Sequence, residues 1–198
     1  MGCKERREKE KEVMKQRILD AAMELVDKKG LGALTIRCLA EQIEYSPSMI
    51  YEYFEDKELI CKELCTQICC ELLNALKNVP SKTNPEEYLL GLIDANVDFL
   101  SKRPQGIELL TGVCFGSDPS QTPKEFLETM ELYTQALKGC HCKHLQTAKE
   151  LEEALDVIRS LHVGMMTLSK YQTSSVELKR IGNSLENGVC ALLRGWGN

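Results

Sequence analysis

Ten cysteines are the least ordinary feature of this 198-residue chain. The run Cys140-His141-Cys142-Lys143-His144 places four soft ligands in one expected loop, where they could hold zinc or another thiophilic metal. Its spacing is not that of a standard zinc module, and the ligands closest together cannot easily both adopt tetrahedral geometry. We therefore predict no metal site, and a metal sensor built on Cys140, His141, Cys142 and His144 remains the alternative.

A second group of thiols recurs every four residues at Cys61, Cys65 and Cys69, with Cys70 beside it. This spacing places the first three on one face of an expected helix. A chain in a reducing compartment keeps its cysteines reduced, and free cysteines usually pack as small hydrophobic side chains. We predict that these thiols are buried, with thiol sensing as the alternative.

Catalytic constellations are missing from the sequence. There is no phosphate-binding glycine loop and no HExxH motif, and the three histidines have no nucleophile at an informative spacing. We predict that the chain is not an enzyme.

The segment 35–57, TIRCLAEQIEYSPSMIYEYFEDK, has the outline of a helix-turn-helix. Thr35 is a good N-cap for a first helix, and Ser46 followed by Pro47 specifies the start of a second. In the second helix, Ile50 and Phe54 are four residues apart and are expected to face the domain core. One side of that helix is then held by the core, and the other is free to meet a partner.

Three runs of this region, QRILDAAMELVDKKG, ALTIRCLAEQI and YSPSMIYEYFEDKELI, resemble the N-terminal DNA-binding domain of the TetR (tetracycline repressor) family. The resemblance covers about residues 15–59. It implies an all-α fold, with an N-terminal three-helix DNA-binding domain and a C-terminal helical domain for ligand binding and dimerisation. It also implies a homodimer, a double-stranded DNA operator, and an unknown small-molecule effector with no further cofactor.

Carried over to this chain, the resemblance implies phosphate contacts at Thr35, Tyr51, Tyr53 and Lys57. It makes Arg37, Ser48 and Met49 candidates for reaching base edges. A guanidinium can pair bidentately with guanine O6 and N7, which makes Arg37 chemically the best reader. The full set of expected DNA-binding residues is Thr35, Arg37, Ser46, Ser48, Met49, Tyr51, Tyr53 and Lys57.

Some residues of this segment depart from the family pattern. Glu44 and Tyr45 stand in the turn where the family usually has a glycine and a small apolar residue, and Ser48 stands where Gly or Ala is common. A positive φ at a non-glycine residue would strain that turn. Glu44, Glu52 and Glu55 also place carboxylates near the path of the phosphates, where they tune specificity or weaken binding.

The first residues, 4–15, alternate acidic and basic side chains with almost nothing apolar. They are expected to form a solvated helical extension held by i,i+4 ion pairs. The alternative is an N-terminal arm in which Arg6, Arg7 and Lys11 approach DNA.

Further along, a long helix is expected from Asp56 to about Asn78, and more helices at about 85–101, 104–115, 123–138, 145–170 and 174–193. We divide the chain into a DNA-binding domain, 1–58, and a regulatory and dimerisation domain, 59–198. The last two helices have apolar stripes that suit a four-helix dimer interface, although an intrachain hairpin would give the same pattern.

Aromatic and methionine side chains commonly line apolar ligand sites, and several lie in the middle helices. The candidate pocket residues, each equally well explained as core, are Phe99, Phe115, Phe126, Met130, Tyr133, His162 and Met165.

Composition limits the function classes. A net charge of −5 argues against broad, sequence-independent binding to nucleic acid. No apolar run approaches the roughly 18 residues that span a bilayer, so we expect a cytoplasmic protein without a membrane partner.

We predict a homodimeric repressor that a small molecule releases from its operator. The alternatives are a helical interaction module with a degenerate helix-turn-helix and a thiol or metal sensor.

Overall fold

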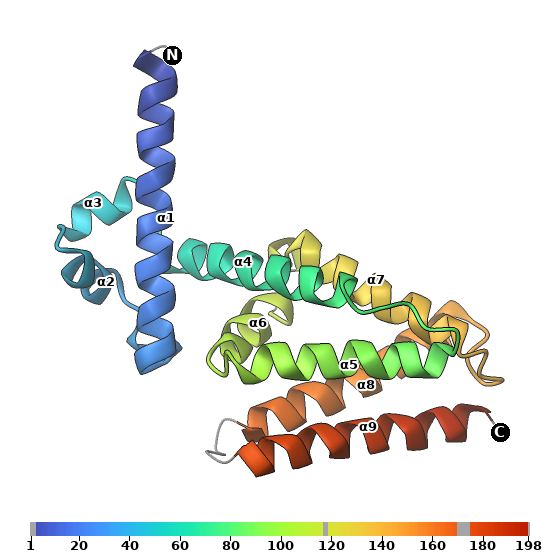
Figure 1. Ribbon diagram of the computed structural model, residues 1–198. Coiled ribbons are helices and arrows are strands. Elements are labelled where there is room, and N and C mark those ends of the chain that lie inside the picture. The colour runs from blue at the N-terminus through green and yellow to red at the C-terminus, as the bar shows by residue number, and fades with distance from the viewer. Residues whose placement is uncertain (1–2, 117–118, 170–174, 198) are drawn as a thin grey trace.

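The computed structural model describes residues 3–116, 119–169 and 175–197 and contains only helices within these ranges, which confirms the all-α prediction (Figure 1). A small N-terminal domain with α1–α3 lies at one end of α4, and α5–α7 pack along the rest of α4. Helices α8 and α9 pack on each other and on α5, away from α4. The helices are α1 (Cys3–Lys29), α2 (Ile36–Ile43), α3 (Pro47–Tyr51), α4 (Lys57–Lys77), α5 (Pro85–Ser101), α6 (Gly106–Cys114), α7 (Lys124–Gly139), α8 (Ala148–Ser169) and α9 (Ser175–Gly197), with 3-10 turns η1 (Leu31–Ala33) and η2 (Pro119–Gln121).

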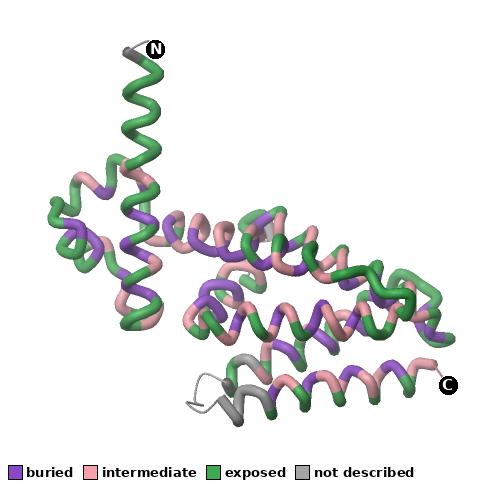
Figure 2. Tube along the Cα trace, in the orientation of Figure 1, coloured by how far each residue is buried: buried purple, intermediate pink, exposed green. Residues whose placement is uncertain are grey.

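Helix α1 has two parts with different environments. Residues 4–13 are exposed and project beyond α3, as Figure 2 shows in green. Within this part, Arg6 Nε pairs with Glu10 Oε1 at 2.8 Å, an i,i+4 pair of the kind expected for a solvated extension. From Ile18 onward the helix buries one side against α2 and α4, and it ends at Gly30, whose φ of 81° suits glycine.

Local signals fix the helix starts of the N-terminal domain. The Thr35 hydroxyl accepts a hydrogen bond of 3.1 Å from Cys38 N, and the Ser46 hydroxyl accepts one of 3.3 Å from Met49 N. Asp56 caps α4 by accepting from Leu59 N at 2.7 Å. Phe54 is 1% exposed and closes the core, as its apolar spacing predicts.

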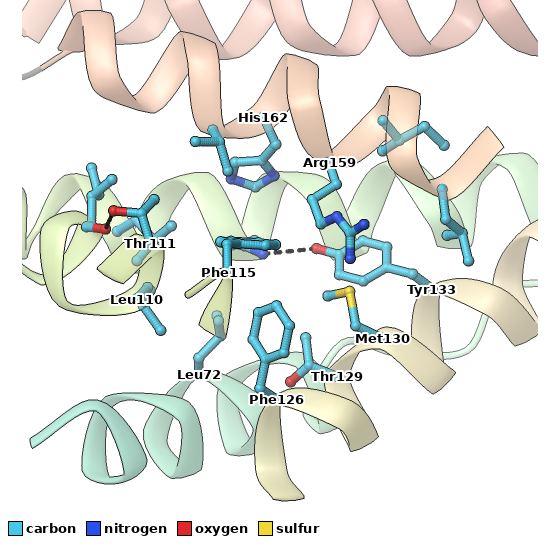
Figure 3. A pocket seen from close by; sticks show the side chains of 16 residues that line it. Leu72, Leu110, Thr111, Phe115, Phe126, Thr129, Met130, Tyr133, Arg159 and His162 are labelled. Carbon is cyan, nitrogen blue, oxygen red and sulfur yellow. Dashed lines mark hydrogen bonds between the residues drawn. The ribbon is translucent and has the colours of Figure 1, made fainter. Parts of the chain in front are cut away.

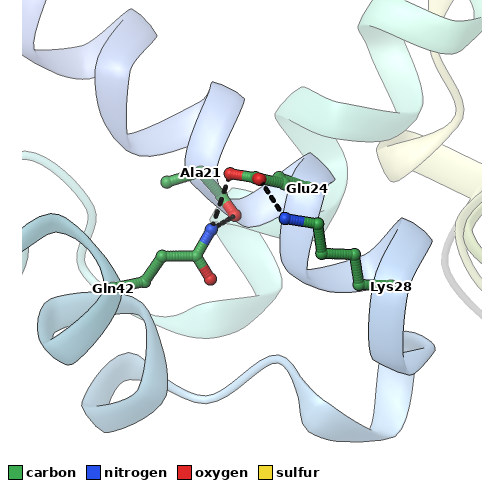
Figure 4. Close-up of polar contacts among 4 residues, drawn as sticks. All are labelled: Ala21, Glu24, Lys28 and Gln42. Carbon is green, nitrogen blue, oxygen red and sulfur yellow. Dashed lines mark hydrogen bonds and ion pairs between the residues drawn. The ribbon is translucent and has the colours of Figure 1, made fainter.

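A polar contact fastens α2 to α1 beside this core (Figure 4). Gln42 Nε2 donates to the Ala21 carbonyl at 3.2 Å and to Glu24 Oε2 at 3.0 Å. Lys28 pairs with the same Glu24 carboxylate and lowers its pKa. The orientation of α2 on α1 is therefore held by hydrogen bonds as well as by apolar packing.

Helix α4 contributes buried residues to the cores of both domains. Its residues Ile60 and Leu64 pack with the N-terminal domain, and Ile68 and Cys69 belong to the same buried cluster as Leu110 of α6. At Gly106, the first residue of α6, an added Cβ would lie 3.3 Å from Ile68 Cδ1, so a glycine allows this close approach. Helix α6 therefore packs closely on α4 at this point.

The helices of the larger domain match the expected ones, with shifted ends. Pro85 opens α5 behind the Asn84 cap, and Pro123 immediately precedes α7. Pro104, expected to open a helix, instead lies in the turn before Gly106, since the α6 N-cap is Gln105. Helix α8 begins later than expected, at Ala148, and α9 continues to Gly197; the predicted bounds at residues 170 and 174 lie outside the described residues.

None of the helices within the described ranges is both long and apolar enough to cross a membrane.

Candidate nucleic-acid interface and ligand cavity

The outer face of the helix-turn-helix carries several of the predicted DNA-binding residues. Arg37, Ser48 and Tyr51 are exposed, and the Arg37 side chain retains 85% of its accessible surface. Its Nε pairs with Glu41 Oε1 at 3.0 Å, one turn along α2. An exposed pair of this kind contributes little to stability, so Arg37 can exchange Glu41 for another acceptor at low free-energy cost.

The remaining predicted residues lie at helix starts or partly in the core. Thr35 and Ser46 accept capping hydrogen bonds through their oxygens, and each hydroxyl proton can still be donated to an external acceptor. Met49 and Tyr53 are half-buried against the apolar core, so they also have a packing role. Lys57 is the first residue of α4 and makes no ion pair with the described residues.

The unusual turn between α2 and α3 has the backbone strain expected from its sequence. Glu44 adopts φ 61° and ψ 42°, the left-handed conformation that glycine favours. Arg17 of α1 supports the next residue, because its guanidinium lies 5.2 Å from the centroid of the Tyr45 ring and 3.4 Å from the Tyr45 hydroxyl. Arg17 Nη2 also donates to the Ile43 carbonyl at 3.4 Å. No local sequence pattern indicates this role for Arg17.

Carboxylates flank the exposed face. Glu44, Glu52 and Glu55 are all exposed, so they can repel a phosphate backbone placed in the wrong register. The face therefore combines exposed donors with local negative charge.

A cavity of about 80 Å³ lies among α4, α5, α6, α7 and α8 (Figure 3). At one side, the rings of Phe115 and Phe126 meet edge-on with centroids 5.4 Å apart. Phe115 is 42% exposed, and the Arg159 guanidinium lies 5.2 Å from the centroid of its ring. Since Phe115 both lines the cavity and reaches solvent, its movement would open a path into the cavity.

Two buried polar atoms in the cavity lining have no hydrogen-bond partner among the residues that the structure describes. Asn96 Nδ2 donates to the Tyr133 hydroxyl at 3.0 Å, which leaves Asn96 Oδ1 unpaired, and His162 Nε2 is also unpaired. Burial lowers the pKa of His162 to about 4, so this imidazole is neutral at pH 7. Burial also raises the pKa of the Tyr133 hydroxyl, which is therefore neutral as well. A buried unpaired polar group is unfavourable until a partner reaches it.

Most of the predicted pocket residues line this cavity, while two do not. Phe115, Phe126, Met130, Tyr133 and His162 are in the lining. Phe99 instead packs between the two apolar clusters, and its ring lies 5.3 Å from the Arg103 guanidinium; Met165 packs against the apolar cluster of the larger domain.

Asn96 was not among the predicted pocket residues, although the sequence carries a signal for it. The buried face of α5 consists of Leu89, Leu92, Ile93, Asn96 and Leu100, which makes Asn96 the polar member of an otherwise apolar stripe.

The prediction that the thiols of α4 are buried is confirmed for Cys65 and Cys69, whereas Cys61 and Cys70 are only half-buried. Cys114 of α6 joins the two buried thiols, and the three Sγ atoms lie within 4.8 Å of one another. Hydrogen bonding with Cys65 and Cys69 lowers the pKa of Cys114, while the pKa values of those two thiols are raised.

The loop 140–144 does not bring its ligand atoms together in this way. Cys140 Sγ donates to the Ala136 carbonyl at 3.4 Å, Cys142 is buried, and His141 and His144 are exposed. The thiols of Cys65, Cys69 and Cys114 therefore lie close together, whereas the four side chains of this loop do not.

An apolar strip remains uncovered on α8. Val157, Leu161 and Leu168 are 42%, 37% and 57% exposed and line a shallow groove together with Gly164. Helix α8 also packs on α9, and buried residues of the two helices that include Ile158 and Leu185 belong to one apolar cluster. The last two helices thus form an intrachain hairpin and still offer an apolar outer face.

Part of the chain matches the model of a known protein family. The family described as bacterial regulatory proteins, tetR family, matches residues 18–64, which contain α2, α3 and the start of α4. The HTH-type transcriptional regulator BetI of Paraburkholderia phymatum is 24% identical over 130 residues, covering 63% of this chain and 65% of that regulator. The chain thus spans slightly less than two thirds of the length of this curated relative.

Solved structures share the whole architecture. BioQ of Mycobacterium smegmatis has a TM-score of 0.67 at 19% identity, with 92% of this chain and 97% of that chain covered. A structure of BioQ with its natural double-stranded DNA operator gives a TM-score of 0.62 at 19% identity, with 87% and 98% covered. At such identities the likeness establishes the fold.

Proposed function

We propose that the chain is a DNA-binding transcriptional regulator of the TetR family, supported by the match of residues 18–64 and the similarity to BetI. In this proposal it is a homodimeric repressor that releases its operator when a small molecule occupies the cavity around Asn96 and His162. The observation that carries the effector part is the pair of unpaired buried atoms, Asn96 Oδ1 and His162 Nε2, in the lining of one cavity.

The DNA-binding role is supported by the exposed face of the helix-turn-helix. In such motifs the second helix enters the major groove, and phosphate contacts fix its register. Arg37 is exposed with only a surface partner, and Lys57 is a cation at the start of α4, where the helix dipole alone would not favour it. An external phosphate would explain this position for Lys57.

The cavity favours a compact, largely apolar effector with hydrogen-bonding groups. The Asn96 oxygen requires a donor, and the neutral His162 ring can accept or donate at Nε2 according to its tautomer. An apolar cavity of about 150 Å³ holds benzene, so a volume of about 80 Å³ requires lining side chains such as Phe115 to move for any larger compound.

Such a movement has a route to the DNA-binding domain. Phe115 follows the last residue of α6, and α6 packs on α4. Helix α4 packs on α1 and is connected to α3 by residues 52–56. A shift of α6 would therefore change the orientation of α4 and, in a dimer, the separation of the two α3 helices.

Dimerisation is supported by the apolar strip on α8. Contiguous exposed apolar side chains commonly mark a protein interface, and a two-fold dimer would pack two copies of this strip together.

Leu168→Glu places a charge in the strip and should give a monomer in analytical ultracentrifugation. Leu127→Glu is the matched control, because Leu127 of α7 is 58% exposed outside the strip, and it should leave the dimer intact. Equal masses for the two variants would contradict the interface.

The DNA-binding part is tested by selection from a random duplex pool with the purified full chain. The proposal expects enrichment of a near-palindromic sequence whose half-sites are spaced by about one helical turn. Recovery of no sequence above the starting pool would favour the alternative, an interaction module with a degenerate helix-turn-helix.

The effector part is tested with a library of small neutral compounds that are scored by thermal shift. A ligand should stabilise the wild type in a concentration-dependent way and should reduce operator binding. Asn96→Leu should weaken binding of the same compounds, while Phe99→Leu, outside the cavity, should not. Compounds that stabilise both variants equally would place the ligand elsewhere.

A further inference from the structure

Three cysteine thiols from two helices converge between α4 and α6. Cys65 and Cys69 are one turn apart on α4, and Cys114 is the last residue of α6. Their Sγ atoms all lie within 4.8 Å of one another, and those of Cys65 and Cys114 are 3.5 Å apart. Sulfur ligands at about 2.3 Å from one ion lie roughly 4 Å from each other. The thiols are thus already near the separations that a shared ion requires.

We propose that Cys65, Cys69 and Cys114 form a binding site for one thiophilic metal ion, held by three thiolates. Soft thiolate ligands select ions such as Cu(I) and Zn(II), whereas Mg²⁺ and Ca²⁺ require oxygen ligands. The ion would form three metal–sulfur bonds, and the thiols would release their protons to solvent. This site does not depend on the proposed function, and it is separate from the cavity around Asn96.

The site lies close to the surface at one side. Cys114 is half-buried, and Cys61, one turn before Cys65, lines a groove beside Gly112 and Val113 of α6. Cys65 and Cys69 are themselves buried, so an ion held there would be shielded from solvent. Once bound, it would join α4 to the end of α6 next to Phe115.

The test uses the reduced full chain, kept anaerobic with a phosphine reductant. Cu(I) and Zn(II) are titrated separately against chromophoric chelators, and we expect one equivalent of at least one ion to bind. Cys114→Ser should weaken that binding more than about 100-fold, since loss of even an outer partner of a metal site costs about 10–100-fold. Cys38→Ser, which changes an exposed cysteine of α2, and the double variant Cys140→Ser/Cys142→Ser should bind as the wild type does.

X-ray absorption of the loaded wild type gives a readout that does not depend on how well a variant folds, and it should show three sulfur ligands around the ion. Circular dichroism checks that each variant keeps its helix content. The proposal is overturned if neither ion binds the folded wild type, or if Cys114→Ser binds the ion as tightly as the wild type does. It is also overturned if metal binding is lost in the Cys140→Ser/Cys142→Ser variant instead, or if the spectrum shows mainly nitrogen and oxygen ligands.

Discussion

The Asn96 side chain donates a hydrogen bond of 3.0 Å to the Tyr133 hydroxyl, which itself donates to the Leu92 carbonyl at 3.1 Å. This relay joins α7 to α5 inside the larger domain. It satisfies the Tyr133 hydroxyl and the amide nitrogen of Asn96, while the amide oxygen of Asn96 remains unpaired. The same two residues therefore stabilise the empty domain and present an acceptor to the cavity.

Tyr133→Phe removes the centre of this relay. It leaves the buried amide of Asn96 without an acceptor, and it should lower the free energy of unfolding by about 1–3 kcal/mol. Chemical denaturation of the two proteins measures this difference. Tyr51→Phe, at a ring that is 56% exposed, is the control and should change stability by less than about 0.5 kcal/mol. Equal stabilities of Tyr133→Phe and the wild type would show that the relay contributes nothing.

His162 should make the protein less stable in acid. Its pKa is about 4 in the folded chain, against an ordinary value of 6.5, so between these pH values the unfolded state binds a proton that the folded state does not. Stability should therefore fall as the pH drops from about 6.5 towards 4, by roughly 3 kcal/mol from this group. His162→Gln removes that part of the pH dependence.

The measurement for His162 is the difference in unfolding free energy between variant and wild type at several pH values. His144→Gln changes an exposed histidine and should run parallel to the wild type. A constant difference for His162→Gln across the whole range would contradict the buried, neutral imidazole.

Glu44 should be replaceable by glycine with a gain in stability. Its left-handed backbone disfavours a side chain, so Glu44→Gly is expected to raise the melting temperature and to stabilise the fold by up to about 1 kcal/mol. The same change at Glu41, in the right-handed backbone of α2, should destabilise by about 0.5–1 kcal/mol. If both glycines destabilise equally, the strain at Glu44 is not significant.

The N-terminal domain was predictable because its signals are local. Thr35, Ser46 and Asp56 specify helix starts within a few residues of themselves, and the apolar spacing of Ile50 and Phe54 identifies the buried side. The strain at Glu44 also follows from its position in a turn that normally takes glycine. The support that Arg17 gives to this turn crosses from α1, and no local pattern indicates it.

The cavity and the thiol group were less predictable, because they depend on tertiary contacts. Aromatic composition suggested Phe115 and Tyr133 correctly as lining residues, but it also suggested Phe99, which packs in the core. Cys65 and Cys69 share a helix face that the sequence shows, whereas Cys114 is brought to them by the packing of α6 on α4. Only the folded chain reveals that third thiol.

The central claim is that this helix-turn-helix reads a specific operator. The most direct test compares the binding of Arg37→Ala and Lys57→Ala with that of the wild type. Binding to the selected operator and to a scrambled duplex is measured over a range of salt concentrations. Arg37→Ala should lose about 1–3 kcal/mol of discrimination between the two duplexes. Lys57→Ala should weaken both complexes and reduce the salt slope by about 0.9, the contribution of one phosphate. If both variants bind both duplexes with wild-type affinity and salt dependence, the assigned face does not contact DNA.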